Sequence, residues 1–321
     1  MACDKPKAGP TQALALGAPP ESTLVREPIE PLPTSTGVSV ERARLGRRLF
    51  NDKRLSGDNS VACATCHDLK RGGVDGRAHS LGVSGKVGAV NAPTVLNASL
   101  NFALFWDGRA ATLEEQAGGP IQNPLEMASN FASVLKKLEQ DADYVRSFKQ
   151  LFDDGVTESN VRGAIAEYER TLLTPGSPFD RFLEGDKAAI SEQAKAGYLL
   201  FKGVGCVACH QGRNVGGNMF QRFGVFGNYF KDRGNIGEAD YGRFNVTHNE
   251  ADRFVFRVPS LRNVARTAPY LHDGSKQTLP EVVQVMAKYQ LGRSLDDDQV
   301  AQIVAFLSSL SGPDPSEPSA L

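Results

Sequence analysis

The sequence predicts a mainly α protein made of two tandem domains that are copies of one fold. Three observations predict this class: a length of 321 residues, enough for about two domains; apolar residues at helical spacing with no strand-rich block; and short motifs that recur in the same order in both halves. We expect a flexible arm at 1–37, domains at 38–178 and 179–312, and a flexible tail at 313–321, because both ends are rich in proline.

Charge and hydropathy narrow the class of protein further. The chain has 36 Lys+Arg and 37 Asp+Glu, a net charge of −1, so it lacks the basic excess of a nucleic-acid-binding protein. Its apolar runs are far shorter than the roughly 18 residues of a membrane-spanning helix. A hydrophobic content of 40% excludes a disordered chain.

Four of the five cysteines lie in two copies of the pattern C-x-x-C-H. These copies are formed by Cys63, Cys66 and His67, and by Cys206, Cys209 and His210. The pattern is the attachment signature of c-type haem, since two thiols one helical turn apart reach two vinyl groups and the histidine ligates the iron. A zinc site would place its C-x-x-C pairs about 15–20 residues apart, whereas Cys63 and Cys206 are 143 apart. The sequence therefore predicts two covalently attached haem c groups in two cytochrome c-like domains.

An internal repeat accompanies the haem motifs. Pro93, Asn97, Asp107 and Thr112 recur 166 residues later as Pro259, Asn263, Asp273 and Thr278. The haem motifs are offset by only 143, so the second copy has 23 additional residues between them. We place these residues in the glycine-rich stretch 203–242 and expect an irregular loop there.

Helices are expected at matching places in the two copies. Apolar residues at helical spacing precede each haem motif, at Leu45 and Leu49 and at Tyr198 and Phe201. Closing helices are predicted at 161–173 and 296–310. A further helix is predicted between Thr278 and Gly292, because Thr278 and Glu281 have the spacing of a capping box.

The copies differ at the position where a second haem ligand would lie. Met286 is the methionine best placed to be the sixth ligand of the second iron, since Met219 follows His210 by only nine residues. The alternative is that Met286 packs on the apolar face of its helix. The residue 166 positions earlier is Pro120, which cannot ligate iron. The first haem is therefore predicted to have an open face.

Two polar residues flank Pro120. Gln116 precedes it by four residues and Glu126 follows it by six. A carboxylate in an apolar, proline-rich turn is a candidate acid–base group. The alternative is a solvated surface acid.

The chain resembles the bacterial di-haem cytochrome c peroxidase family over residues 40–312. The motifs that carry the resemblance, besides the first haem motif, are GGVDG at 72–76, NAPTVLN at 91–97, FWDGR at 105–109, QNPLEM at 122–127 and APYLHDG at 268–274. The resemblance implies a periplasmic enzyme that reduces hydrogen peroxide with electrons from a small cytochrome c or copper protein. It also suggests a homodimer.

The resemblance assigns roles to matching positions. His67 would ligate the peroxidatic haem, with Glu126 as the distal acid–base residue and Gln116 beside it. His210 and Met286 would ligate the electron-accepting haem, and Trp106 would lie between the haems on the electron route. A Ca²⁺ ion would be held between the domains by Asn91 and the backbone carbonyls of Thr267 and Pro269, an oxygen-only set that suits a hard cation.

The sequence departs from many members at one position. These members have a removable distal histidine just after a Ser-x-Gly element, where this chain has Val83, while His79 lies before the element. Either His79 substitutes, or the peroxidatic haem is already open when both irons are oxidised, which is our expectation.

Two other functions are compatible with two haems. A related enzyme that matures methylamine dehydrogenase by oxidising a protein substrate has tyrosine where this chain has Met286, which favours the peroxidase. A non-enzymatic di-haem electron carrier would have two six-coordinate haems, and Pro120 argues against it. The fifth cysteine, Cys3, is either a free thiol or a lipid-modified anchor left after signal removal.

Overall fold

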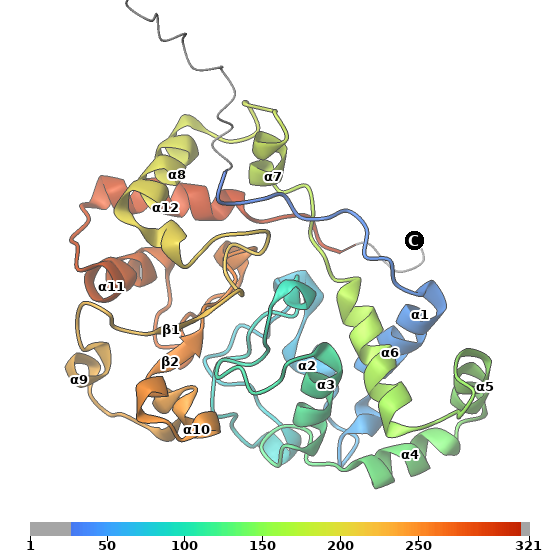
Figure 1. Ribbon diagram of the computed structural model, residues 1–321. Coiled ribbons are helices and arrows are strands. Elements are labelled where there is room, and N and C mark those ends of the chain that lie inside the picture. The colour runs from blue at the N-terminus through green and yellow to red at the C-terminus, as the bar shows by residue number, and fades with distance from the viewer. Residues whose placement is uncertain (1–26, 316–321) are drawn as a thin grey trace, which may run out of the picture.

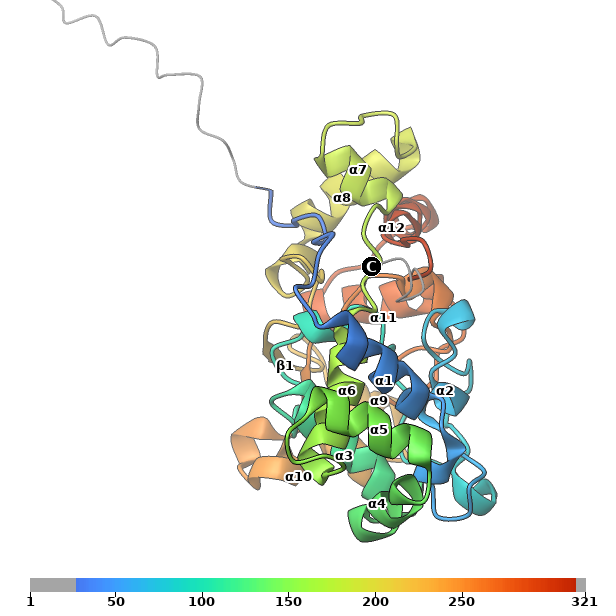
Figure 2. The same cartoon turned by 90° about the vertical axis from the view of Figure 1, so that its right-hand side faces the viewer.

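The computed structural model describes residues 27–315, which form a mainly helical molecule of two halves (Figure 1). Cys3 lies outside the described residues. In Figure 2, α7 (Pro178–Leu183), α8 (Glu192–Val204) and α12 (Asp297–Ser309) lie at the top of the molecule, and the helices between residues 40 and 170 lie below them. The predicted mainly α class is confirmed.

The N-terminal half is built on six helices. They are α1 (Val40–Phe50), α2 (Cys63–Cys66), α3 (Leu113–Gln122), α4 (Phe131–Glu139), α5 (Ala142–Leu151) and α6 (Glu158–Arg170). Short 3-10 turns lie at Lys53–Leu55, Leu69–Arg71, Val83–Gly85 and Ala98–Leu100. Its main apolar cluster draws on residues between Leu45 and Leu172.

The C-terminal half has six helices and one small sheet. The helices are α7 (Pro178–Leu183), α8 (Glu192–Val204), α9 (Tyr229–Arg233), α10 (Phe244–Thr247), α11 (Leu279–Leu291) and α12 (Asp297–Ser309). Strands β1 (Phe220–Arg222) and β2 (Val255–Arg257) pair antiparallel, with Gln221 opposite Phe256. Short 3-10 turns lie at Cys206–Ala208, Glu238–Tyr241, Glu250–Asp252 and Val264–Arg266.

The same pair of crossing helices forms the frame of each half. Helix α1 packs on α6, and α8 packs on α12. Each crossing is made at a glycine: a Cβ on Gly46 would lie 1.8 Å from the carbonyl oxygen of Ala164, and one on Gly197 would lie 1.9 Å from that of Gln302. Only a residue without a side chain permits this approach.

The 166-residue repeat is visible in the backbone. Asn97 and Asn263 both adopt the left-handed conformation, with φ of 58° and 61°. Antiparallel bridges join Leu104 to Ala110 and, 166 residues on, Tyr270 to Lys276. The two halves therefore share a chain path through this region as well as a set of motifs.

The predicted helices agree with the structure to within a few residues. Helix α11 is flanked by Thr278, whose side chain accepts from the backbone N–H of Glu281, and by Gly292 in the left-handed conformation. Helix α12 has Asp296 as its N-cap. Helix α6 begins at Glu158, three residues before the predicted start, because Thr157 caps it by accepting from the N–H of Asn160.

The predictions for 203–242 and for the N-terminal arm differ from the structure. The glycine-rich stretch contains β1, α9 and two 3-10 turns, and its aromatic residues Tyr229 and Phe230 are buried. Within the predicted arm, Ile29 and Leu32 are 1% and 4% exposed, and Ile29 belongs to the apolar cluster of the C-terminal half. Burial of these two side chains explains why the chain from residue 27 packs against the rest of the protein.

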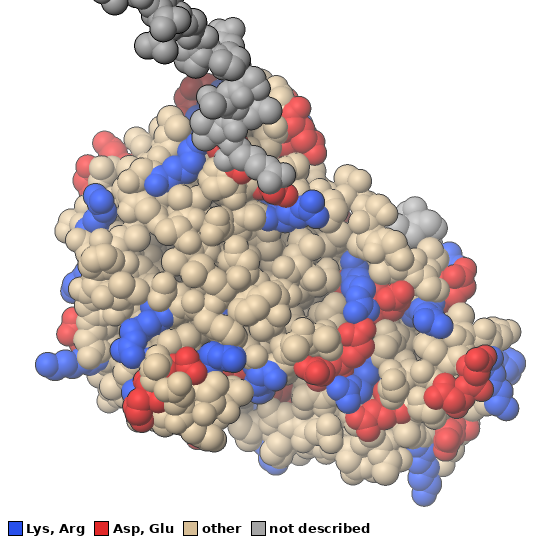
Figure 3. All heavy atoms as spheres, in the orientation of Figure 1, with Lys and Arg blue, Asp and Glu red and all other residues tan. Residues whose placement is uncertain are grey.

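Surface charge is mixed. Basic and acidic side chains are interspersed on the face shown in Figure 3, without an extended basic area. Within residues 27–315, no helix combines the length and apolar character that crossing a bilayer requires.

Candidate functional site

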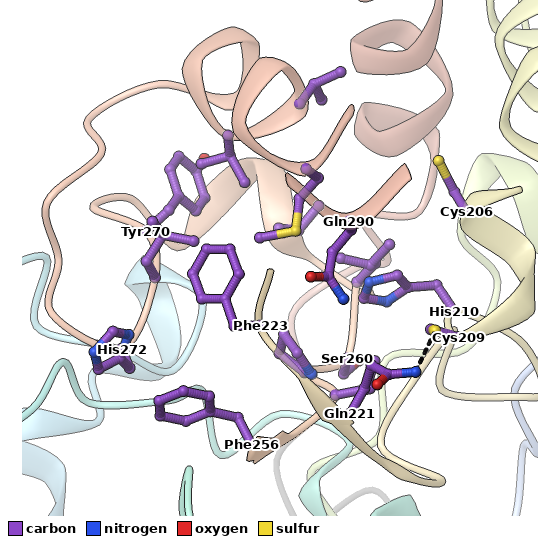
Figure 4. Close-up of a pocket in the computed structure, with 18 of the residues that line it drawn as sticks. Cys206, Cys209, His210, Gln221, Phe223, Phe256, Ser260, Tyr270, His272 and Gln290 are labelled. Atoms are coloured by element: carbon purple, nitrogen blue, oxygen red, sulfur yellow. Dashed lines mark hydrogen bonds between the residues drawn. The ribbon is translucent and has the colours of Figure 1, made fainter. Parts of the chain in front are cut away.

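A cavity of about 430 Å³ lies in the C-terminal half and reaches the N-terminal half. His210, Met286 and the two cysteines of the second motif line it, and so does the segment 91–94 of the N-terminal half. In Figure 4, His210 and Cys209 lie on one side of the cavity, and Tyr270 and His272 lie on the other. Its other lining residues are mostly apolar, as a largely apolar porphyrin requires.

His210 has the geometry of a metal-ligating imidazole. Helix α8 ends at Val204 with Gly205 as its left-handed C-cap, and a 3-10 turn follows it. The Nδ1 of His210 lies 3.3 Å from the carbonyl oxygen of Val215. A proton on Nδ1 would be donated there, which leaves Nε2 as the metal-binding nitrogen. Burial lowers the pKa of His210 to about 4, so the ring is neutral at pH 7.

The thiols of both motifs are free to form thioether bonds. Within the described residues, none of Cys63, Cys66, Cys206 and Cys209 is in a disulfide. Burial raises the pKa of Cys206 to about 11, and burial also raises the pKa of Cys66. At the second motif, the donor set of free thiols next to a neutral imidazole on an apolar cavity fits a covalently attached haem.

The structure brings Met286 to the cavity of His210. Met286 lies on α11 and lines this cavity together with His210, whereas Met219 is not among the lining residues. This placement favours Met286 over Met219 as a sixth ligand.

His67 repeats this arrangement in the N-terminal half. Its Nδ1 lies 3.1 Å from the carbonyl oxygen of Gly73, and burial lowers its pKa. The ring lies 6.5 Å from that of Phe50, at the end of α1. As at His210, the backbone acceptor orients the imidazole with Nε2 available for a metal.

Glu126 lies in the turn that follows α3. Its Oε1 accepts a hydrogen bond of 2.6 Å from the side chain of Asn123. Burial raises the pKa of Glu126, while the bond from Asn123 and the charge of Arg109 act in the opposite direction. Its carboxylate is close enough to Cys63 and Cys66 to raise the pKa of both thiols, as a smaller effect than their burial. The charge of Glu126 therefore acts on both thiols of the first haem motif.

Pro120 and Met286 occupy equivalent places in equivalent helices. Helix α3 is capped by Thr112, which accepts from the N–H of Glu115, just as Thr278 accepts from that of Glu281 on α11. Both residues follow their cap by eight positions. Gln116 lies one turn before Pro120, partly buried, and its side chain has no hydrogen-bond partner among residues 27–315.

The backbone at Gly82 and Val83 packs against the turn that carries Glu126. Val83 is 8% exposed, and its N–H donates to the carbonyl oxygen of Glu126 at 2.7 Å. A Cβ on Gly82 would lie 2.1 Å from the carbonyl oxygen of Leu125, so the two loops are in backbone contact. His79 lies before this contact, and its buried Nδ1 has no partner in the described part of the chain.

Trp106 lies at the junction of the two halves and lines the cavity. Its Nε1 donates to the carbonyl oxygen of Asn91 at 2.9 Å, and its ring centroid is 6.4 Å from that of His272. His272 is the residue 166 positions after Trp106, so equivalent residues of the two copies face each other. The structure brings together Trp106 and the second predicted haem centre.

The three predicted calcium ligands also line this cavity. Asn91, Thr267 and Pro269 are all among its lining residues. The side-chain nitrogen of Asn91 donates to the carbonyl oxygen of Arg77, and no described residue donates to its Oδ1. An oxygen without a donor fits a hard cation.

Two buried polar groups near the centres were missed by the sequence analysis. His272 is 2% exposed and bonds Asp240 at 2.6 Å, and the pairing of its position with Trp106 in the repeat could have indicated it. Glu169 on α6 is 5% exposed, and burial raises its pKa to about 8. No sequence signal separates Glu169 from the surface acids around it.

Comparisons with known proteins agree with this arrangement. A family model described as di-haem cytochrome c peroxidase matches residues 40–188. Cytochrome c551 peroxidase of Nitrosomonas europaea is 47% identical over 307 residues, which cover 94% of this chain and 90% of that protein. Cytochrome c peroxidase Ccp of Escherichia coli K12 is 47% identical over 287 residues; the match covers 89% of this chain and 61% of that longer protein.

A solved structure shows the same fold. A MauG-like protein associated with microbial copper homeostasis superposes with a TM-score of 0.77 at 29% identity. The superposition covers 94% of this chain and 96% of that one.

Proposed function

Because this chain belongs to the di-haem cytochrome c peroxidase family, we propose that it reduces hydrogen peroxide to water at its N-terminal centre, with electrons that enter at its C-terminal centre. The reaction is H₂O₂ + 2e⁻ + 2H⁺ → 2H₂O. The observation that carries the proposal is the difference between the centres. Met286 lines the cavity of His210, whereas Pro120, six residues before Glu126, stands at the equivalent place in α3.

The C-terminal centre is proposed to accept and hold electrons. His210 and Met286 would be the two axial ligands of its haem, attached at Cys206 and Cys209. Ligation by methionine and histidine raises the reduction potential of haem iron. Trp106, which contacts both halves, would lie on the route to the N-terminal centre.

The N-terminal centre is proposed to cleave peroxide. Cys63 and Cys66 would attach the haem and His67 would ligate its iron, which when bound supplies the redox chemistry of O–O cleavage. Glu126 would accept a proton from one peroxide oxygen at Oε2, since its Oε1 is held by Asn123. It would return that proton to the other oxygen, which leaves as water. Gln116 would lie beside the substrate.

Proton transfer by a positioned group accounts for about 10²–10⁴ in rate. The raised pKa of Glu126 suits this exchange, because a carboxylate that is easier to protonate is a better base.

We further propose that the N-terminal centre is open in the oxidised enzyme. The apolar side chain of Val83 cannot ligate iron, and its backbone is held on that of Glu126. His79 is the nearby alternative ligand. The oxidised protein should therefore react with peroxide without prior reduction, and its absorption spectrum should not change in His79→Ala.

The calcium site, the electron donor, the cellular location and the oligomeric state are proposed from membership of the family. Asn91 and the carbonyls of Thr267 and Pro269 would hold Ca²⁺ between the halves. The electron donor would be a small cytochrome c or copper protein. The enzyme would be a periplasmic homodimer, with domains at 38–178 and 179–312.

Peroxide turnover with a reduced small cytochrome tests the proposal. Wild type should turn over, Glu126→Gln should lose about 10²-fold or more, and Glu139→Gln, an exposed acid on α4, should be unchanged. Full activity in Glu126→Gln would refute the acid–base role. Absence of turnover under every reducing condition would instead favour a di-haem electron carrier, and oxidation of a protein substrate alone would favour a maturation-type enzyme.

A further inference from the structure

The cavity of the C-terminal half is lined by cationic side chains without a matching acid. No aspartate or glutamate is among its lining residues, whereas two arginines are. Arg222 is exposed at the end of β1, so water can solvate it. Arg257, at the end of β2, is 4% exposed.

Arg257 makes hydrogen bonds only to neutral groups. Its Nε donates to the carbonyl oxygen of Phe105 at 3.2 Å, and its Nη1 lies 3.3 Å from Oδ1 of Asn101 and 3.4 Å from the carbonyl oxygen of Val258. Within residues 27–315, no group accepts from its Nη2 and no carboxylate pairs with it. The two N–H groups of Nη2 therefore lack a partner among the described residues, and Arg257 is one of the residues that line the cavity.

The other buried arginine of this half shows a complete set of partners. Arg262 is 1% exposed and forms a 2.7 Å ion pair with Asp180. Its Nε and Nη2 donate to the carbonyl oxygens of Arg213 and Glu30, each at 2.8 Å. Arg262 does not line the cavity, so its charge is balanced by the protein itself.

An unpaired buried charge is costly, and arginine does not escape the cost by losing its proton. Buried charges in folded proteins are paired, since transfer of an isolated ion from water costs many kcal/mol. Burial lowers the pKa of Arg257 to about 10, which still leaves it charged at pH 7. An anion bound in the cavity would balance this charge.

We propose that Arg257 is a positioning residue that pairs with a propionate of the haem attached at Cys206 and Cys209. A guanidinium N–H makes a strong, charge-assisted hydrogen bond to a carboxylate oxygen, and the free Nη2 of Arg257 could donate one. This inference rests on the proposed C-terminal haem and adds to it the residue that balances its charge.

Arg257 also contacts the segment that carries Trp106. The backbone N–H of Arg257 donates to the carbonyl oxygen of Trp106 at 2.9 Å, and its side chain holds the carbonyl of Phe105. One residue thus joins the propionate to the segment of the N-terminal half that carries Trp106. This contact would position the haem relative to Trp106.

The reduction potential of the C-terminal haem tests the pairing. In Arg257→Gln at pH 7, loss of the cation leaves the propionate charge unbalanced and disfavours reduction. We expect the equilibrium constant for one-electron reduction to fall at least about tenfold, or ~59 mV. Arg222→Gln, the matched control on the same cavity, should change it less than about threefold. Equal shifts in the two variants, or none in Arg257→Gln, would overturn the assignment.

A charge-preserving variant covers the case in which Arg257→Gln does not fold. In Arg257→Lys the charge remains but the forked geometry is lost, so the propionate-bending band of the resonance Raman spectrum should shift while the potential stays within about threefold. An unchanged band would contradict the pairing. The number of covalently bound haems per chain is measured in every sample. Fewer than two haems per wild-type chain would refute the di-haem proposal itself. Two haems per chain, with potentials and Raman bands unaltered in the Arg257 variants, would refute only the role of Arg257.

Discussion

The side chains of Asn97 and Asn263, equivalent residues of the two copies, donate to one acceptor, the hydroxyl oxygen of Thr174, each at 2.9 Å. All three residues are at most 1% exposed. The side-chain oxygen of Asn97 accepts from the backbone N–H of Thr174, and that of Asn263 accepts from the backbone N–H of Gly312. One buried hydroxyl, in the segment between the two copies, therefore accepts a hydrogen bond from each of them.

Thr174→Val should destabilise the fold by about 2–4 kcal/mol, because it leaves two buried amide donors without an acceptor at nearly constant volume. The free energy of unfolding from guanidinium titration measures this. Thr171→Val, in which the lost hydroxyl donates to a carbonyl of its own helix, is the control and should cost less than about 1 kcal/mol. Equal losses in the two variants would show that the shared hydroxyl is unimportant.

Met286→Ala should abolish the absorption signature of methionine ligation and lower the potential of the C-terminal haem, because methionine ligation raises that potential. Spectroelectrochemical titration measures both quantities. Met219→Leu should keep the signature, since Met219 does not line the cavity. Loss of the signature only in Met219→Leu would reverse the ligand assignment.

Asn123→Asp should move the acidic limb of the kcat/KM profile for peroxide to higher pH. The substitution replaces the donor to Glu126 with an anion, and both changes disfavour the ionised form and raise the pKa of Glu126 further. A base is active when deprotonated, so activity would be lost at a higher pH than in wild type. Asn130→Asp makes the same change at the cap of α4 and should leave the limb in place.

Glu169→Gln should stabilise the protein increasingly as pH rises from 5 to 8. The pKa of Glu169 is about 8 when folded and near its ordinary 4.5 when unfolded, so between these values the unfolded chain releases a proton that the folded one keeps. Wild type therefore loses stability across this window, by up to about 5 kcal/mol.

Denaturant titrations at pH 5 and pH 8 separate this effect from packing. The advantage of Glu169→Gln should be small at pH 5 and large at pH 8, and Glu158→Gln on the same helix is the matched control. An advantage that does not depend on pH would mean that Glu169 does not titrate in this range.

The sequence by itself determined those features that depend on local chemistry or on comparison of its two halves. The C-x-x-C-H motifs specify covalent haem because thiol spacing and the adjacent histidine lie within one turn. Helix α11 was predicted to its caps because Thr278 and Gly292 act on their own neighbours. The difference between Met286 and Pro120 required only the 166-residue offset.

Only the tertiary structure decided which distant residues share an environment. Ile29 is docked on the C-terminal half, and the charge of Arg257 lacks an acid, because of contacts with residues far away in the chain. Burial and charge balance are properties of the whole set of neighbours, which composition and spacing do not specify. For the same reason Glu169, like any glutamate in sequence, becomes a buried acid with a pKa near 8 only when α6 packs in the folded protein.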